Sequence, residues 1–160
     1  MTSRLHSCPE CGAVLAKIRS IGDHRRFFGV IKAAFLNWPH AHEFQPTDPE
    51  HLRAWLLCRA GYHTVQTIPV EHAGADVQPA ILRLVALAVE GSVKAAQAEG
   101  HHAFTRVHGA GIAIFKPRSL KFETLSQKEF GPIREAVEEI IESVIGVPAG
   151  DLLREAEKAA

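Results

Sequence analysis

The sequence predicts an α+β domain in which several helices pack on a small antiparallel sheet. Apolar residues recur at helical spacing in several stretches that are bounded by capping residues, glycines and prolines. Shorter stretches rich in Val, Ile, Thr and Phe are separated by turn residues, as expected for strands. The 160 residues contain no internal repeat and suffice for one domain with a sizeable core. We therefore expect a single domain over 1–160, with a knuckle-like element at 1–16, an α+β body at 17–146 and a C-terminal helix at 147–160.

Near its N-terminus the chain carries a pair of cysteines in a tight-turn sequence. Cys8 and Cys11 have the Cys-x-x-Cys spacing that directs two thiolates at one ion, as in the first half of a zinc knuckle. A structural zinc needs four ligands and there is no second Cys-x-x-Cys, so Cys58 and His63, or His6 with another histidine, would have to complete the set. The alternative is a turn without metal, with Cys58 an ordinary buried helix residue.

The first helix is expected from Asp23 to Asn37. Asp23 is a suitable N-cap, and Pro39 prevents continuation of the helix. Three cations fall outside the apolar stripe and should stay accessible, namely Arg25, Arg26 and Lys32. The side chains at helical spacing that should face the core are Phe27, Phe28, Ile31, Ala34, Phe35 and Trp38.

The middle of the chain predicts two more helices and a strand. Thr47 and Glu50 have the spacing of a capping box that opens a helix running to Ala60. The stretch from Tyr62 to Val70 is rich in Thr, Val and Ile and contains Pro69, so we expect a strand near a sheet edge. The residues from Ala80 to Glu99 favour a helix that is interrupted or bent near Gly91.

Two short apolar runs further on are typical of a hairpin. Phe104–Val107 and Ile112–Phe115 are separated by His-Gly-Ala-Gly, a turn sequence. Ser119–Phe122 is expected to extend the second strand past Pro117.

The C-terminal part predicts two helices. Ser126 and Glu129 form a second capping-box pattern, and Gly146 and Pro148 end the helix that it opens. A short final helix carries Leu152 and Leu153. One side of the longer helix is apolar, and its glutamates surround the other side.

Formal charge is zero overall but unevenly distributed. Residues 1–121 carry 14 lysines and arginines against 9 acidic residues, whereas 122–160 carry 4 against 9. The zero net charge argues against a uniformly basic surface. The uneven distribution of charge can steer an anionic ligand to one side of the protein. The alternative is an acidic helix face that is simply solvated. No apolar run resembles a signal peptide or is long enough to cross a bilayer, so we expect a cytoplasmic protein without membrane contact.

Two basic segments are candidate anion-binding sites. Arg19, His24, Arg25 and Arg26 surround the start of the first helix, and guanidinium groups suit phosphate oxygens. Lys116, Arg118 and Lys121 follow the hairpin, with Phe115 and Phe122 nearby. Basic residues beside aromatic rings can contact phosphates and stack bases. The alternative for this second segment is a polar sheet edge that discourages aggregation. The two segments would form one site only if they lie side by side.

Motifs of known catalytic chemistry are missing. The sequence has no nucleophile elbow, no phosphate-binding glycine loop and no His-Glu-x-x-His helix. The ten histidines lack the neighbouring carboxylates that a catalytic metal site requires. No motif in the sequence requires an enzymatic function.

Several short stretches carry a resemblance to phage proteins. The run from Arg19 to Phe28, followed by a long helix, is similar to the opening of NinB-type phage recombination proteins. That resemblance implies binding of single-stranded DNA and assistance in loading recombinases. From about Lys17 to Ile145 the chain also resembles an uncharacterised phage and prophage family. The landmarks of this second resemblance are His24–Phe28, Ala60–Tyr62, Pro117–Phe122 and Glu129–Phe130. The chain departs from the NinB pattern in Ala80–Glu99 and in its C-terminal half.

The leading hypothesis is therefore a phage- or prophage-derived accessory protein that binds nucleic acid, expected to be single-stranded DNA, in recombination or replication without catalysis. An alternative is an inhibitor that binds a host or defence protein, such as an anti-CRISPR protein, with the acidic C-terminal helix imitating nucleic acid. A second alternative is a metal-dependent nuclease. A homodimer, a host or phage protein partner and a structural zinc are left open.

Overall fold

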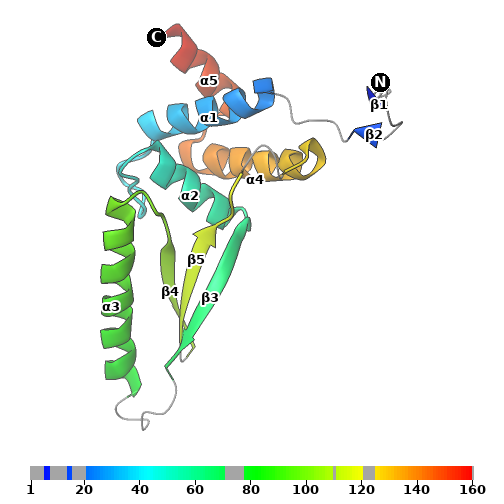
Figure 1. Cartoon of the computed structure of the whole chain (residues 1–160). Helices are drawn as coiled ribbons and strands as arrows, with labels where there is room; N and C mark the ends of the chain where they lie inside the picture. The colour runs from blue at the N-terminus through cyan, green and yellow to red at the C-terminus, as the bar shows by residue number, and fades with distance from the viewer. Residues whose placement is uncertain are drawn as a thin grey trace. The chain divides into compact units, whose positions relative to one another are not determined.

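The computed structural model describes residues 6–7, 14–15, 21–70, 78–109, 111–120 and 125–159. Within these residues it contains five helices, a three-stranded antiparallel sheet and a short two-stranded pair, so the predicted α+β class is confirmed (Figure 1). In the short pair, β1 (His6–Ser7) runs antiparallel to β2 (Val14–Leu15). None of the helices so described is both long and apolar enough to traverse a bilayer.

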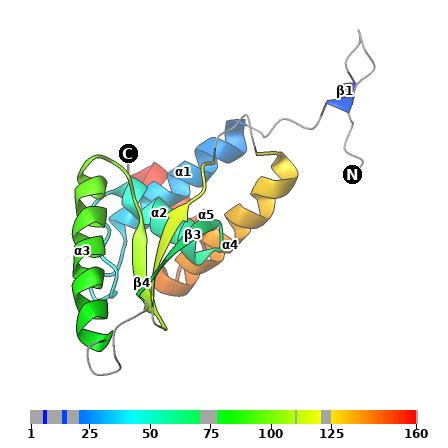
Figure 2. The same cartoon turned by 60° about the horizontal axis from the view of Figure 1, so that its bottom comes forward.

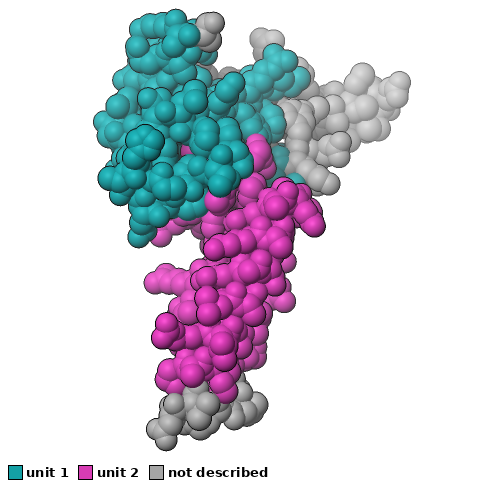
Figure 3. Space-filling model, turned by 90° about the vertical axis from the view of Figure 1, so that its left-hand side faces the viewer, with its two compact units in different colours: residues 1–49, 119–160 teal, residues 50–118 magenta. Residues whose placement is uncertain are grey.

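The chain divides into two compact units (Figure 3). Unit 1 comprises Met1–Pro49 and Ser119–Ala160, and unit 2 comprises Glu50–Arg118. The expectation that both belong to one domain stays a prediction.

Unit 1 is built from three helices, α1 (Ile21–Leu36), α4 (Gln127–Ile145) and α5 (Ala149–Lys158), with α1 contacting both of the others. The ring of Phe27 meets that of Phe130 edge to face at 5.3 Å, and neither side chain is exposed. The stripe predicted for the first helix is largely buried, while Arg25, Arg26 and Lys32 are exposed as expected. The core of unit 1 includes Phe27, Val30, Ile31, Ala34, Phe130, Val137, Ile141 and Leu152.

The role predicted for Asp23 is wrong. The helix starts at Ile21, so Asp23 lies inside the first turn and not at the N-cap. Its carboxylate accepts a hydrogen bond from Gln127 Nε2 at 2.9 Å and lies 3.7 Å from Arg134 Nη1. Asp23 thus joins α1 to α4, and a contact far away in the sequence overrides the local capping signal.

The capping box predicted for α4 is confirmed. The Ser126 hydroxyl accepts from Glu129 N, and Ser126 N donates to the Glu129 carboxylate at 3.0 Å. These bonds from Ser126 lower the pKa of Glu129. Gly146 ends the helix at φ 78°, in the left-handed conformation that glycine adopts without a steric penalty.

Unit 2 contains α2 (Pro49–Arg59, apart from its first residue), β3 (His63–Pro69), α3 (Gln78–Ala98), β4 (Phe104–His108) and β5 (Gly111–Pro117). The sheet order is β3-β5-β4, so β3 is an edge strand and β4 with β5 forms the expected antiparallel hairpin. Gly111 is required because a Cβ there would lie 2.9 Å from the Ile68 carbonyl oxygen.

Two details of unit 2 differ from expectation. First, α3 runs without interruption through Gly91, because one glycine costs a helix only about 1 kcal/mol and its neighbours are good helix formers. Second, β5 ends at Pro117, and Ser119 and Leu120 do not extend it. Proline has no N–H for continued pairing, and the chain leaves the sheet after Arg118 N bonds to the Tyr62 carbonyl at 3.1 Å.

Candidate functional site

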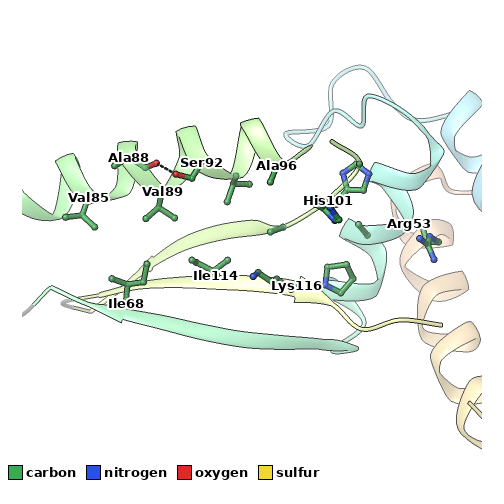
Figure 4. Close-up of a pocket in the computed structure, with 16 residues that line it drawn as sticks. Arg53, Ile68, Val85, Ala88, Val89, Ser92, Ala96, His101, Ile114 and Lys116 are labelled. Carbon is green, nitrogen blue, oxygen red and sulfur yellow. Dashed lines mark hydrogen bonds between the residues drawn. The ribbon is translucent and has the colours of Figure 1, made fainter. Parts of the chain in front are cut away.

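A groove of about 850 Å³ separates α3 from the sheet of unit 2 (Figure 4). In Figures 1 and 2 α3 runs along the β4 side of the sheet, and none of its residues is buried. The helix therefore borders open space instead of sealing a core. The apolar side chains that line the groove include Ile68, Val85, Ala88, Val89, Val93, Ala96 and Ile114.

Strand register explains which sheet residues face the groove. Ile68 of β3 pairs with Ile112 of β5, so the two side chains project from the same face. Alternation places Ile114 and Lys116 on that face as well. Lys116 therefore continues the apolar row of β5 and ends it with a cation.

One end of the groove is cationic. Arg53 of α2, His101 and His102 before β4, and Lys116 all line it, and no acidic residue stands among its described lining residues. In Figure 4, Arg53, His101 and Lys116 lie toward the α2 end, while Val85 and Ile68 lie toward the other. The guanidinium of Arg53 also pairs with Glu50, one turn earlier in α2. The groove thus combines apolar walls with positive charge at one end.

A stack of three rings positions His102. Its ring lies 5.1 Å from that of His51 and nearly parallel to it, and His51 lies 5.7 Å from the ring of Phe104. The Nδ1 atom of His102 is buried and has no hydrogen-bond partner in the part of the chain that the structure describes.

Cations and aromatic rings also meet at two other places in unit 2. The Arg118 guanidinium lies 6.0 Å from the Tyr62 ring centre, and that of Arg59 lies 5.5 Å from the Trp55 ring. Phe115, which was predicted to support the basic segment, projects from the opposite face to Lys116 and packs against His63 at 5.2 Å. Among the described residues, Tyr62 rather than Phe115 meets a cation of this segment, and Phe122 lies outside the described residues.

The other predicted cations belong to unit 1. Arg25 and Arg26 are exposed on α1, and Arg26 Nη2 lies 3.8 Å from the place that a Cβ of Gly150 would occupy. His24 packs its ring on Phe28 at 4.7 Å, which gives it a local structural role. These residues and Lys116 lie in different units, so a common site formed by the two basic segments stays a prediction. Arg19 and Lys121 lie outside the described residues.

The predicted zinc site gains no support from the described part of the chain, which contains no group of three metal-ligating side chains. Burial raises the pKa of the Cys58 thiol to about 11, which disfavours the thiolate that binds a metal. His63 is engaged with Phe115. Cys8 and Cys11 lie outside the described residues, so zinc binding by these two cysteines stays a prediction.

The acidic helix makes local contacts. Arg134 lies 3.8 Å from the carboxylates of both Glu135 and Glu138, and the carboxylate of Glu142 accepts a hydrogen bond from Ala149 N at 3.0 Å. Several glutamates of α4 thus serve the packing of unit 1.

Reasoning from sequence missed Arg53, His101 and His102 as site residues. Two signals were present. The segment of α3 is apolar on nearly all sides, which is unusual for a helix that covers a sheet with one face. His101 and His102 also directly precede a predicted strand at the helix end, where a groove beside that helix would terminate.

Comparisons with models of protein families, with curated proteins and with solved structures give no match to this chain.

Proposed function

We propose that this chain is a non-catalytic protein that binds single-stranded nucleic acid, with the groove of unit 2 as the contact site. The observation that carries the proposal is the apolar groove with Arg53, His101 and Lys116 at one end. In line with the phage resemblance, the proposed ligand is single-stranded DNA, handled during phage recombination or replication in the cytoplasm.

The chemistry of the groove favours a single strand over a duplex. Unpaired bases present apolar faces that pack on apolar and aromatic side chains, and their phosphates seek cations. The walls formed by Val85, Val89 and Ile114 suit the bases, whereas Lys116 and Arg53 suit the phosphates. A duplex keeps its bases stacked inside and would leave the apolar walls unused.

The pairs Arg118–Tyr62 and Arg59–Trp55 are further candidate contacts for nucleic acid in unit 2. Each pair offers a ring for stacking together with a guanidinium for a phosphate. Arg25 and Arg26 of unit 1 are a second cationic segment whose contribution is measured separately with Arg25→Gln and Arg26→Gln.

The test is fluorescence anisotropy with a labelled single-stranded oligonucleotide of mixed sequence, and with its duplex, over a series of salt concentrations. We expect tighter binding of the single strand. In Lys116→Gln with Arg118→Gln, the slope of log K against log salt should fall by about 0.7 for each lost phosphate contact.

A matched control removes two cations of unit 1, with Lys128→Gln in α4 and Lys158→Gln in α5. Its slope should equal that of the unmodified protein. Absence of binding at low salt, or equal slopes for both double variants, would contradict the proposal.

The inhibitor and nuclease hypotheses gain no comparable observation. Glu135 and Glu138 of α4 lie near Arg134 and Glu142 accepts a hydrogen bond from Ala149 N, and the described residues hold no cluster of metal ligands. Both remain hypotheses that lysate pull-down and a nuclease assay with chelator can test.

A further inference from the structure

The outer side of α3, opposite the groove, carries an exposed apolar stripe. Leu84 is 67% exposed and Leu87 is 64% exposed, the two largest values among the large apolar side chains of unit 2. Figure 3 views the molecule from the side on which α3 lies in Figure 1. Exposed leucines next to one another on a long helix are typical of an interaction surface. This stripe is distinct from the groove wall, which is formed by Val85, Val89 and Val93.

The exposed stripe follows a heptad spacing. Ala80, Leu84, Leu87, Gly91 and Ala98 are separated by four, three, four and seven residues, as in the contact seam of two packed helices, and all are exposed. Lys94 completes the pattern. The small residues allow close approach, and space is open around the position that a Cβ of Gly91 would occupy.

Charged residues along one flank of this seam favour a second copy of the same chain as the partner. Arg83 and Glu90, both exposed, are seven residues apart and occupy equivalent positions beside the seam. When two identical helices pack antiparallel, the same flank of each helix lies on the same side of the seam. The residues of that flank then run in opposite directions along the two helices. A two-fold axis near Leu87 then sets Arg83 of one copy against Glu90 of the other, twice.

The same two-fold axis also brings the apolar residues of the two copies into contact. It sets Leu87 against Leu87 of the second copy, and Leu84 against the open space at Gly91. In a parallel arrangement the flank that carries Arg83 and Glu90 would face the opposite flank of the second copy, so these two residues would not meet across the seam.

We infer that α3 is the interface of a homodimer in which the helices of two copies pack antiparallel through Leu84, Leu87 and Gly91, with paired contacts between Arg83 and Glu90. The interface leaves the groove of each copy accessible. It is independent of whether the groove binds nucleic acid.

Sedimentation equilibrium of the full chain, over a wide range of concentrations, tests this inference. We expect a monomer–dimer equilibrium whose dissociation constant rises at least ~100-fold in Leu84→Asp with Leu87→Asp, because the buried apolar area is lost and four carboxylates are brought together. The matched control is Leu36→Asp on α1, which is 69% exposed and should leave the equilibrium unchanged.

Charge exchange tests the direction of packing. Arg83→Glu alone and Glu90→Arg alone should each weaken the dimer by about 3- to 10-fold, and the double exchange should restore it. A monomer at all concentrations would overturn the inference. So would a dimer that resists the leucine substitutions, or one in which the double exchange fails to restore affinity. Circular dichroism of each variant verifies that α3 remains helical.

Discussion

The long helices of the two units, α4 of unit 1 and α3 of unit 2, differ in how far their apolar residues are buried. In unit 1, α1 and α4 bury their apolar stripes, and Phe27 and Phe130 meet with no exposed surface. In unit 2, α3 is more apolar than α4 along its sequence, yet none of its residues is buried. One side of α3 borders the groove, and the other carries exposed leucines. The difference is in line with the proposal that the apolar residues of α3 stay accessible to a ligand, whereas those of α1 and α4 stabilise unit 1.

The largest expected effect concerns the closed core of unit 1. Phe130→Ala removes a fully buried ring that packs on Phe27, and it should lower the free energy of unfolding by about 3–5 kcal/mol. Urea denaturation followed by circular dichroism measures this loss. A loss below about 1 kcal/mol would mean that unit 1 is no better packed than unit 2.

A matched pair of valines sharpens the comparison. Val137 is completely buried in α4, so Val137→Trp should overpack the core and cost about 1–3 kcal/mol of unfolding free energy. Val89 lines the groove, so Val89→Trp should change stability by less than about 1 kcal/mol while weakening oligonucleotide binding. Equal losses of stability in the two variants would show that the groove is a packed interior.

The capping box of α4 should contribute a smaller amount. Ser126→Ala removes the hydroxyl that accepts from Glu129 N and should cost about 1 kcal/mol. Ser143→Ala on the same helix is the control and should cost less, because its hydroxyl bonds only to the Ile140 carbonyl within the helix.

The pH dependence of that contribution follows from the sign of the shift. Because the folded pKa of Glu129 is lowered from 4.5, its stabilisation is present above that pH and is lost as the pH falls through the folded pKa. The difference in unfolding free energy between Ser126→Ala and the unmodified protein should therefore shrink on acidification. A constant difference from pH 7 to pH 2 would argue against the box.

The smallest effect concerns Cys58 of α2. Its folded pKa is about 11 against an ordinary 9.0, so folding favours the neutral thiol. As the pH rises from 9 toward 11, the unfolded thiol ionises first and stability falls. Cys58→Ala should reduce this alkaline loss slightly in denaturant titrations at successive pH values. If the unfolding free energy of Cys58→Ala falls with pH as steeply as that of the unmodified protein, the Cys58 thiol is exposed to solvent in the folded state.

The elements of unit 1 were predictable because their signals are local. Ser126, Glu129 and Gly146 lie within or directly beside α4, and each acts on backbone groups a few residues away. Asp23 shows the limit of such signals: a carboxylate suited to an N-cap instead bonds Gln127, a residue 104 positions later. The sequence alone does not show whether Asp23 caps the backbone of its own helix or bonds a distant side chain.

The groove could be predicted only in part. Lys116 and Arg118 were identified as a basic segment, but Phe115, which was expected to lie near these cations, projects from the opposite face of the sheet to Lys116. The distance of α3 from the sheet cannot be read from any local pattern, because apolar residues lie both on the side that borders the groove and on the exposed side of this helix. Arg53 and His101 become site residues only through that distance.

Hydrogen–deuterium exchange with and without a single-stranded oligonucleotide tests the central claim most directly, since it reads both units in one experiment. If the groove binds the oligonucleotide, we expect slower exchange in α3 and β5, around Val89 and Lys116, and unchanged exchange in α4 and α5. Protection confined to unit 1, or no protection at a saturating oligonucleotide concentration, would contradict it.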